Sequence, residues 1–468
     1  MAQSTTSKSG TSQGFQVGEL FCGAGGLSRG FHSLGFTPRF ANDVWDVALH
    51  TFLMNFDATY AASGGRSPGE VLSLPGSVEK LDAEDILKRL PSATRKSMGV
   101  GDLDVLLGGP PCQGFSLNSH VRSATDPRNY LFRQYVRLLQ GLAPRVFVLE
   151  NVPGMLSLED GQFFYEFLNA IRAPQGASCP GYDVDFKILN AAHYGVPQER
   201  FRIVVVGTRR DVADQVGMVE LPTPVHLSFA RAHFKGGRTH TFHYAIGHKG
   251  TRDKEVVPLF GNQLLAPRSV QDAIGDLPAL SNGGGKDFSA YPSKHSSDAP
   301  LSKYQKEMRK GAKALTNHWC RGLMPPNTER VKYIPQGGDW RSLPQHLLPL
   351  GMQRALRKDH TKRYGRLSPT DLSGTILTKP DPHWGTFLHY DVAQQRLISV
   401  REAARIQSFP DTHIFFGGQV DQYKLCGNAV PALMARAIAV NVKEVLERHE
   451  ERLEASPAAA RSAPRARV

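Results

Sequence analysis

The sequence has few cysteines and no long apolar run, and its acidic side chains are outnumbered by basic ones. The five cysteines are scattered, so they form neither a disulfide framework nor a zinc-binding spacing. No apolar run approaches the roughly 18 residues of a membrane-spanning helix. Residues 1–14 also lack the apolar core of a secretory signal. These absences exclude disulfide-rich secreted domains and membrane proteins, and they predict a cytoplasmic protein without membrane contact.

The excess of basic residues favours a polyanionic partner. The 468-residue chain carries 56 Lys and Arg against 43 Asp and Glu, a formal net charge of +13. Lysine and arginine side chains on phosphates release condensed counterions, which favours binding to nucleic acid. Basic enzymes without such a partner are equally compatible with this charge, so composition alone leaves both classes open. The length allows one large core and a second domain.

A strand, a glycine-rich turn and a helix follow one another near the N-terminus. The strand-like run 15–21 leads into Cys22-Gly-Ala-Gly-Gly26, and helical spacing starts at Leu27. Such a βα unit is typical of nucleotide-binding α/β folds, because glycines let a ligand approach the backbone. Ser28 replaces the last glycine of the dinucleotide fingerprint G-x-G-x-x-G. This replacement disfavours a nicotinamide oxidoreductase and leaves a nucleoside as the expected ligand.

A second strand, 39–42, ends at Asp43, about 20 residues past the glycines, where such folds place an acid on ribose hydroxyls. Val44 and Trp45 follow and could cover an adenine ring. The alternative role for Asp43 is to cap the helix that begins at Asp46, and both roles can coexist. The Gly/Ser/Pro-rich stretch 61–76 is interpreted as a loop.

Two further strands bring reactive side chains to the same edge of the sheet. The apolar run 105–107 is followed by Gly-Gly-Pro-Pro and then by Cys112, a candidate nucleophile. The apolar run 146–149 is followed by Glu150 and Asn151. The alternatives are a small buried cysteine and a structural ion pair. Because ligands bind at the carboxyl ends of parallel strands, we expect these residues to lie together.

The remainder of the chain divides into a regular and an irregular part. Strands are expected at 181–189 and 202–207, and Arg200 and Arg202 share a face if extended. From 210 to 395 the α/β rhythm breaks down, and basic and aromatic residues suit a nucleic-acid groove. No cysteine or acid completes a metal site around the histidines there, so we expect no metal. Helical patterning returns at 396–410, and 425–431 opens a helix to about residue 449.

Six segments, in order, resemble the motifs of the cytosine-5 DNA methyltransferases of bacterial type. They are the glycine turn 21–26, Gly109-Pro-Pro-Cys-Gln-Gly-Phe-Ser116, Glu150-Asn-Val152, Gln198-Glu-Arg-Phe-Arg202, Arg401-Glu-Ala-Ala-Arg-Ile-Gln-Ser-Phe-Pro410 and Gly427-Asn-Ala-Val430. The resemblance implies a doubly wound, mostly parallel α/β sheet of the S-adenosylmethionine-dependent methyltransferase type, with a second, irregular target-recognition domain. It places the catalytic domain at 15–209 and 396–450, target recognition at 210–395, and disordered tails at 1–14 and 451–468.

The resemblance also implies S-adenosyl-L-methionine as cofactor and assigns roles to single residues. Cys112 would attack cytosine C6 after the base leaves the duplex, Glu150 would stabilise the ring at N3, Arg202 would hold O2, and Arg200 would contact phosphate or the Cys112 loop. Substrate-binding residues would be Gln113, Ser116, Asn151, Gln198 and Thr375. The cofactor would contact Phe21, Gly23, Gly25, Gly26, Leu27, Asp43, Val44, Trp45, Ser77, Val78, Pro111, Asn428 and Val430.

Two departures from the family pattern concern the cofactor. Asp43 stands where glutamate is usual, and the next acidic contact falls at Ser77, Asp82 or Asp85, so that a carboxylate is missing if Ser77 has the right register. The implied partner is double-stranded DNA, bound by a monomer in the cytoplasm at the nucleoid. A cognate restriction endonuclease acting separately is compatible with this role. The alternatives are an RNA (tRNA) cytosine-5 methyltransferase and a catalytically silent DNA-binding relative.

Overall fold

The computed structural model describes residues 14–91, 98–111, 130–173, 179–228, 232–235, 241–244, 264–291, 300–353, 364–378, 382–383 and 385–455. Its centre is a seven-stranded sheet in the order β3-β2-β1-β4-β5-β7-β6. All neighbouring pairs are parallel except those of β7, which runs antiparallel to β5 and β6. The strands are β1 (Gln16–Leu20), β2 (Thr37–Asp43), β3 (Leu72–Pro75), β4 (Val105–Gly108), β5 (Val146–Asn151), β6 (Tyr182–Asn190) and β7 (Phe201–Arg209).

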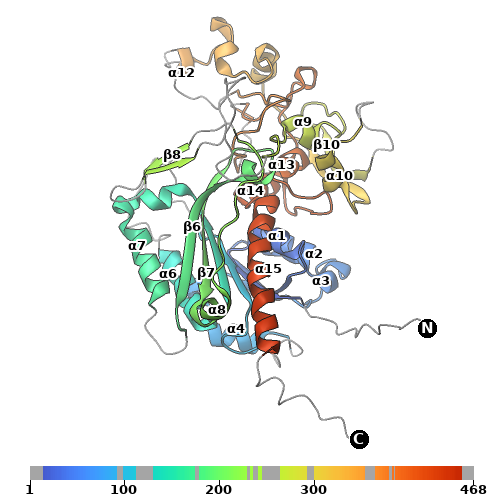
Figure 1. Cartoon of the computed structure of the whole chain (residues 1–468). Coiled ribbons are helices and arrows are strands. Elements are labelled where there is room, and N and C mark those ends of the chain that lie inside the picture. The colour runs from blue at the N-terminus through green and yellow to red at the C-terminus, as the bar shows by residue number, and fades with distance from the viewer. Residues whose placement is uncertain are drawn as a thin grey trace, which may run out of the picture.

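Successive side chains along the strands point to opposite faces of the sheet and pack into two separate hydrophobic cores. In β4, Leu106 enters one core while Val105 and Leu107 enter the other. One face is covered by α4 (Ala83–Arg89), α6 (Tyr130–Leu142) and α7 (Gln162–Arg172). The opposite face is covered by α1 (Gly26–His32), α8 (Arg210–Val216) and α15 (Ala432–Glu454) (Figure 1). This arrangement confirms the expected doubly wound, mostly parallel sheet.

One edge strand was not expected from the sequence. β3 lies inside the stretch 61–76 that we interpreted as a loop, and it pairs in parallel with the residues of β2 from Phe40 to Asp43. It is short and only Leu74 is buried, so its apolar pattern is weak. Helices α2 (Asp46–Phe56) and α3 (Ala58–Ala62) connect β2 to this strand.

The C-terminal helix returns to the first βα unit of the chain. α15 packs along α1, and a methyl group at Gly30 would lie 2.4 Å from the Arg436 nitrogen. Only glycine therefore permits this approach. The helix ends at Glu454, slightly beyond the expected limit at residue 450. The expectation that Leu425 opens this helix was wrong, because 425–428 end α14 (Gln419–Asn428) and Pro431 precedes α15.

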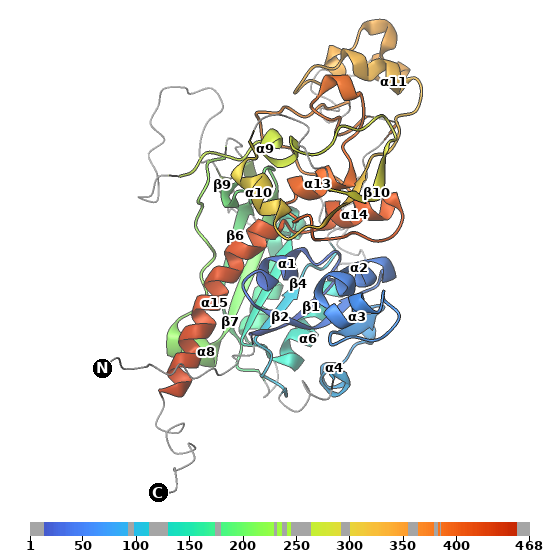
Figure 2. The same ribbon diagram turned by 90° about the vertical axis from the view of Figure 1, so that its right-hand side faces the viewer.

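A second region lies beyond the carboxyl edge of the sheet (Figure 2). Its main core joins α9 (Val270–Ile274), α10 (Lys303–Arg309) and β11 (Ala314–Trp319) to α13 (Val400–Ile406) and α14. The smaller elements are β8 (Ala232–Lys235), β9 (Thr241–Tyr244), β10 (Gly285–Ala290), α11 (Asn327–Arg330) and α12 (Leu350–Gln353). The core therefore mixes segments from both sides of the expected domain boundary at 395.

Among the described residues, no single helix is long and apolar enough to span a membrane. Only α14 and α15 taken together meet this criterion, and the two helices are bent by 41° where they meet. Most side chains along the apolar faces of both helices are buried against the protein itself.

Candidate active site at the carboxyl edge of the sheet

An ion pair lies at the carboxyl end of β5. Glu150 follows four fully buried apolar residues, and its Oε1 is 2.6 Å from Nε of Arg202 on β7. The two side chains are only 11% and 14% exposed. The antiparallel pairing of β5 with β7 brings them together, because Glu150 lies opposite Val204, two residues from Arg202. A carboxyl group and a guanidinium therefore lie side by side at a place that water reaches only in small part.

The Gly-Pro-Pro segment after β4 lies beside this pair. A methyl group at Gly109 would lie 3.4 Å from Oε2 of Glu150. The Asn151 side-chain amide donates to the Pro110 carbonyl oxygen (3.2 Å), and the Asn151 side-chain oxygen accepts from Val152 N–H (2.8 Å). Asn151 thus ties β5 to the segment that ends at Pro111. Cys112 follows directly in the sequence, and Cys112, Gln113 and Ser116 lie outside the described residues.

Arg200 and Gln198 are internal connectors. Arg200 is 1% exposed and donates to the carbonyl oxygens of Ile376 (3.4 Å) and Gly427 (3.0 Å). Gln198 is fully buried, donates to Gln407 Oε1 (2.9 Å) and accepts from Ile376 N–H (2.8 Å). Both side chains are therefore bound inside the protein in this structure. The expected contact of Arg200 with phosphate or the Cys112 loop, and that of Gln198 with the substrate, stay predictions.

Thr375 lies next to this connector. Its hydroxyl donates to the Glu199 carbonyl oxygen (2.8 Å), and Glu199 N–H donates to Ser373 O (2.8 Å). The segment 373–376 therefore runs alongside the residues that precede β7. A role for Thr375 in substrate binding stays a prediction.

The glycine turn is built for a ligand that approaches the backbone. Phe21, Gly23 and Gly25 have positive φ angles of 56°, 52° and 75°. A methyl group at Gly23 would meet no atom within 4 Å, so this position faces open space. At Gly26 it would lie 2.3 Å from the Val430 carbonyl oxygen, which brings the last family motif against the turn. A non-glycine residue such as Phe21 in the left-handed region is characteristic of functional sites.

Asp43 organises the turn. Its carboxylate accepts from Gly23 N–H (2.9 Å) and from Trp45 N–H (2.9 Å). Burial raises the pKa of Asp43 above its usual value, and the backbone N–H groups oppose this effect. Trp45 itself is the residue that precedes α2. Asp43 thus positions the turn and the residue before α2, without a side-chain cap on α2 itself, and its role on the ribose hydroxyls stays a prediction.

Of the three residues considered for the third cofactor contact, Ser77 lies beside Asp43, and the register of this contact stays a prediction. Gly76 N–H donates to the Asp43 carbonyl oxygen (3.0 Å), so Ser77 follows directly at the edge beside Asp43. In contrast, Asp82 caps α4 by accepting from Glu84 N–H (2.9 Å), and Asp85 pairs with Arg89. The position next to Asp43 therefore carries a hydroxyl in place of a carboxylate.

Sequence reasoning missed one buried acid. Glu19 in β1 is 3% exposed and accepts from Ser28 N–H (3.2 Å) and from the Ser28 hydroxyl. Burial raises the pKa of Glu19 to about 8. Two features of the sequence could have predicted this contact. Glu19 lies within an apolar strand, and Ser28 replaces the last glycine of the dinucleotide fingerprint.

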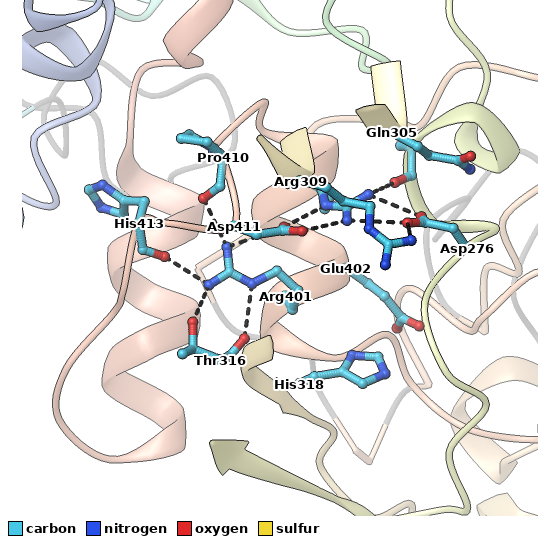
Figure 3. Close-up of polar contacts among 12 residues, drawn as sticks. Asp276, Gln305, Arg309, Thr316, His318, Arg401, Glu402, Pro410, Asp411 and His413 are labelled. Atoms are coloured by element: carbon cyan, nitrogen blue, oxygen red, sulfur yellow. Dashed lines mark hydrogen bonds and ion pairs between the residues drawn. The ribbon is translucent and has the colours of Figure 1, made fainter. Parts of the chain in front are cut away.

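The arginines of the fifth motif form a buried network (Figure 3). Arg405 binds Asp411 (Nε–Oδ1, 2.6 Å) and Asp276 (Nη1–Oδ1, 3.1 Å), and its side chain is fully buried. Arg401 donates to Thr316 Oγ1 (2.7 Å) and to the carbonyl oxygens of Pro410 (3.1 Å) and His413 (2.7 Å). The network thus holds α13 to the second region, while Gln407 after α13 reaches Gln198 beside the candidate active site.

Comparison with known proteins adds a family to this geometry. The model of the C-5 cytosine-specific DNA methylase family matches residues 15–444. The type II methyltransferase M.AgeI of Thalassovita gelatinovora is 29% identical over 91% of this chain and 98% of its own length. The type II methyltransferase M.DdeI of Desulfomicrobium norvegicum is 30% identical over 92% of this chain and 88% of its own. A crystal structure of a putative DNA modification methyltransferase from an E. coli prophage has a similar fold, with a TM-score of 0.60 and 21% identity over 92% of this chain and 99% of that one.

Proposed function

Because the chain belongs to the C-5 cytosine-specific DNA methylase family and is a DNA (cytosine-5)-methyltransferase, we propose that it methylates cytosine C5 within one specific double-stranded DNA sequence, with S-adenosyl-L-methionine as methyl donor. The observation that carries this proposal is the Glu150–Arg202 pair beside the Gly109–Pro111 segment. N3 is a nitrogen of the cytosine ring, and O2 is bonded to the neighbouring ring carbon C2, so both atoms lie on one edge of the base. One carboxyl group and one guanidinium fixed 2.6 Å apart suit that edge of the base.

The residues then divide the chemistry among them. The Cys112 thiolate adds to C6, which turns the poorly nucleophilic C5 into a reactive carbon. Glu150 donates a hydrogen bond or proton to N3, and Arg202 holds O2, so that charge developing on the ring is stabilised. Once C5 has gained the methyl group, a base removes the C5 proton, the C6–sulfur bond breaks, and the Cys112 thiolate is regenerated. Asn151 keeps Pro110 in place and so serves as a positioning residue for the Cys112 segment.

The cofactor supplies a methyl group on a positively charged sulfur, and the glycine turn fits such a nucleoside ligand. Gly23 faces open space, and Asp43 is held beside it by two backbone amides. The Val44 side chain is 73% exposed at the same edge, although it is apolar. The residues that would hold the cofactor are Phe21, Gly23, Gly25, Gly26, Leu27, Asp43, Val44, Trp45, Ser77, Val78, Pro111, Asn428 and Val430.

The base must leave the stack before C6 can meet a thiolate, because duplex stacking covers both faces of the ring. We assign residues 210–395 to target recognition and the excess of basic side chains to phosphate contacts. Gln113, Ser116 and Thr375 are proposed to contact the substrate. Arg200 and Gln198 are proposed to position Arg202 by linking its strand to 376, 407 and 427. The enzyme would act as a monomer on cytoplasmic DNA, with any cognate endonuclease acting separately.

The test is bisulfite sequencing of DNA from a methylation-free bacterial host that expresses the chain. Protected cytosines in one short sequence context, lost in C112S, are the expected result. Unprotected DNA from a folded protein that binds the cofactor would contradict the proposal. Methyl transfer to purified tRNA in the same assay would then assign the activity to RNA.

A further inference from the structure

A lysine from the C-terminal half of the chain lies over the tryptophan of the cofactor edge. The Lys424 Nζ is 4.2 Å from the centroid of the Trp45 ring, within the range of a cation–π interaction. The two residues are far apart in sequence, and Lys424 belongs to none of the motifs quoted above. Trp45 is partly buried against the core of the second region, and part of its side chain stays exposed.

The segment that leads into α14 is hydrogen-bonded to α2. Asn55 on α2 exchanges two hydrogen bonds with the Ile414 backbone, at 2.7 Å and 2.9 Å. Phe416 N–H donates to Thr51 Oγ1 (3.2 Å). These contacts fix the segment that leads into α14, which lies next to α1 and α2 in both views (Figures 1 and 2). The placement of Lys424 over Trp45 therefore follows from the docking of two helices.

The helix face that carries Lys424 also carries an expected cofactor residue. Lys424 and Asn428 are separated by four positions and so lie on one side of α14. Both are exposed, whereas 425–427 between them are buried. Val430, two residues further, contacts the glycine turn at Gly26. The ammonium group also acts on Asp43 by lowering its pKa, against the effect of burial.

We propose that Lys424 is a positioning residue of the cofactor site, which holds the Trp45 indole in the orientation that receives the adenine ring. This inference rests on the proposed function, because it assigns Trp45 to the cofactor. A ring that is preset before binding loses less side-chain freedom when the ligand arrives. Removing the cation would therefore weaken cofactor binding while the chemical groups at Glu150 and Arg202 stay unchanged.

The test is calorimetric binding of S-adenosylhomocysteine, the demethylated product, to the full chain. K424M is expected to raise Kd about 3- to 10-fold, in line with a partly dehydrated cation–π contact. K424R keeps the cation and is expected to bind within about twofold of the wild type. K88M, at the exposed lysine of α4, is the matched control and should leave Kd unchanged. In turnover, K424M should raise KM for the methyl donor and leave kcat intact.

A double-mutant cycle identifies the route of the effect. In a W45L background, K424M should cause no further loss of affinity, because the ring on which it acts is gone. Equal losses in both backgrounds, or K424M that binds like the wild type, would overturn the inference. A wild-type protein that does not bind S-adenosylhomocysteine at all would instead refute the cofactor assignment on which the inference rests.

Discussion

The pair formed by Glu150 and Arg202 joins two antiparallel strands, and the backbone hydrogen bonds of the sheet fix the positions from which both side chains start. Its rigidity comes from the sheet rather than from the loop that carries Cys112. Asn151 extends the same support to Pro110. The two groups that we propose to meet the base are therefore positioned before the substrate arrives, which is the condition for strong electrostatic stabilisation of a transition state.

Glu150→Gln tests this arrangement directly. The variant keeps the shape of the side chain but cannot donate a proton to N3, so we expect the barrier to rise by about 2–4 kcal/mol. Single-turnover methylation of a DNA duplex measures the rate, and thermal unfolding controls for the fold. A single-turnover rate equal to that of the wild type would rule out the proposed role of the carboxyl group.

Glu19 makes folding depend on pH. Its pKa is about 8 in the folded protein and near 4.5 in the unfolded chain, so unfolding releases a proton between these values. The stability contributed by protonated Glu19 is complete below pH 4.5 and is lost as the pH rises towards 8, at up to about 1.4 kcal/mol per pH unit.

Glu19→Gln removes this ionisable group. Relative to the wild type, the variant should gain stability steadily from pH 5 to pH 8, as measured by urea unfolding. The same pH dependence in both proteins would show that Glu19 does not titrate in this range. The wild type measured at each pH serves as the reference, because all other titrating groups are shared.

Among the elements, α1 and α15 approach each other so closely at Gly30 that their contact requires a glycine. Gly30→Ala places a methyl group 2.4 Å from the Arg436 nitrogen, and backbone cannot yield cheaply. We expect a loss of about 1–3 kcal/mol in the free energy of unfolding. Gly99→Ala, where the methyl group lies 3.4 Å from Asp102 Oδ2, is the matched control. Equal stability of the two variants would contradict this packing.

Strands and the sheet edge could be predicted because local pattern carries them. The runs 105–107 and 146–149 are apolar throughout, and each ends in the residues that form the site. β3 was not predicted, because only one of its four side chains is buried and its apolar pattern is therefore weak. The burial of Arg200 could not be predicted, because the residues whose carbonyl oxygens it binds, Ile376 and Gly427, lie 176 and 227 positions away in the sequence. An exposed and a buried arginine have the same local sequence pattern.

For the molecule as a whole, the buried network around Arg405 joins the second region to the site. Asp411→Asn leaves the Arg405 cation with one fewer carboxylate in a fully buried position. We expect a loss of about 3–5 kcal/mol, measured as a lower urea midpoint. Glu329→Gln, in an exposed pair with Lys332, should leave the urea midpoint nearly unchanged, because solvent screens this pair. Similar losses in both variants would mean that the network is not a structural centre.

The position of α15 determines how late in the synthesis of the chain its core can close. The first βα unit emerges from the ribosome early, yet α1 packs against residues 432–454, near the end of the described chain. Val430, which meets the glycine turn, arrives equally late. The core that α15 forms with the sheet and α1 can therefore close only after nearly all of the described chain has been synthesised.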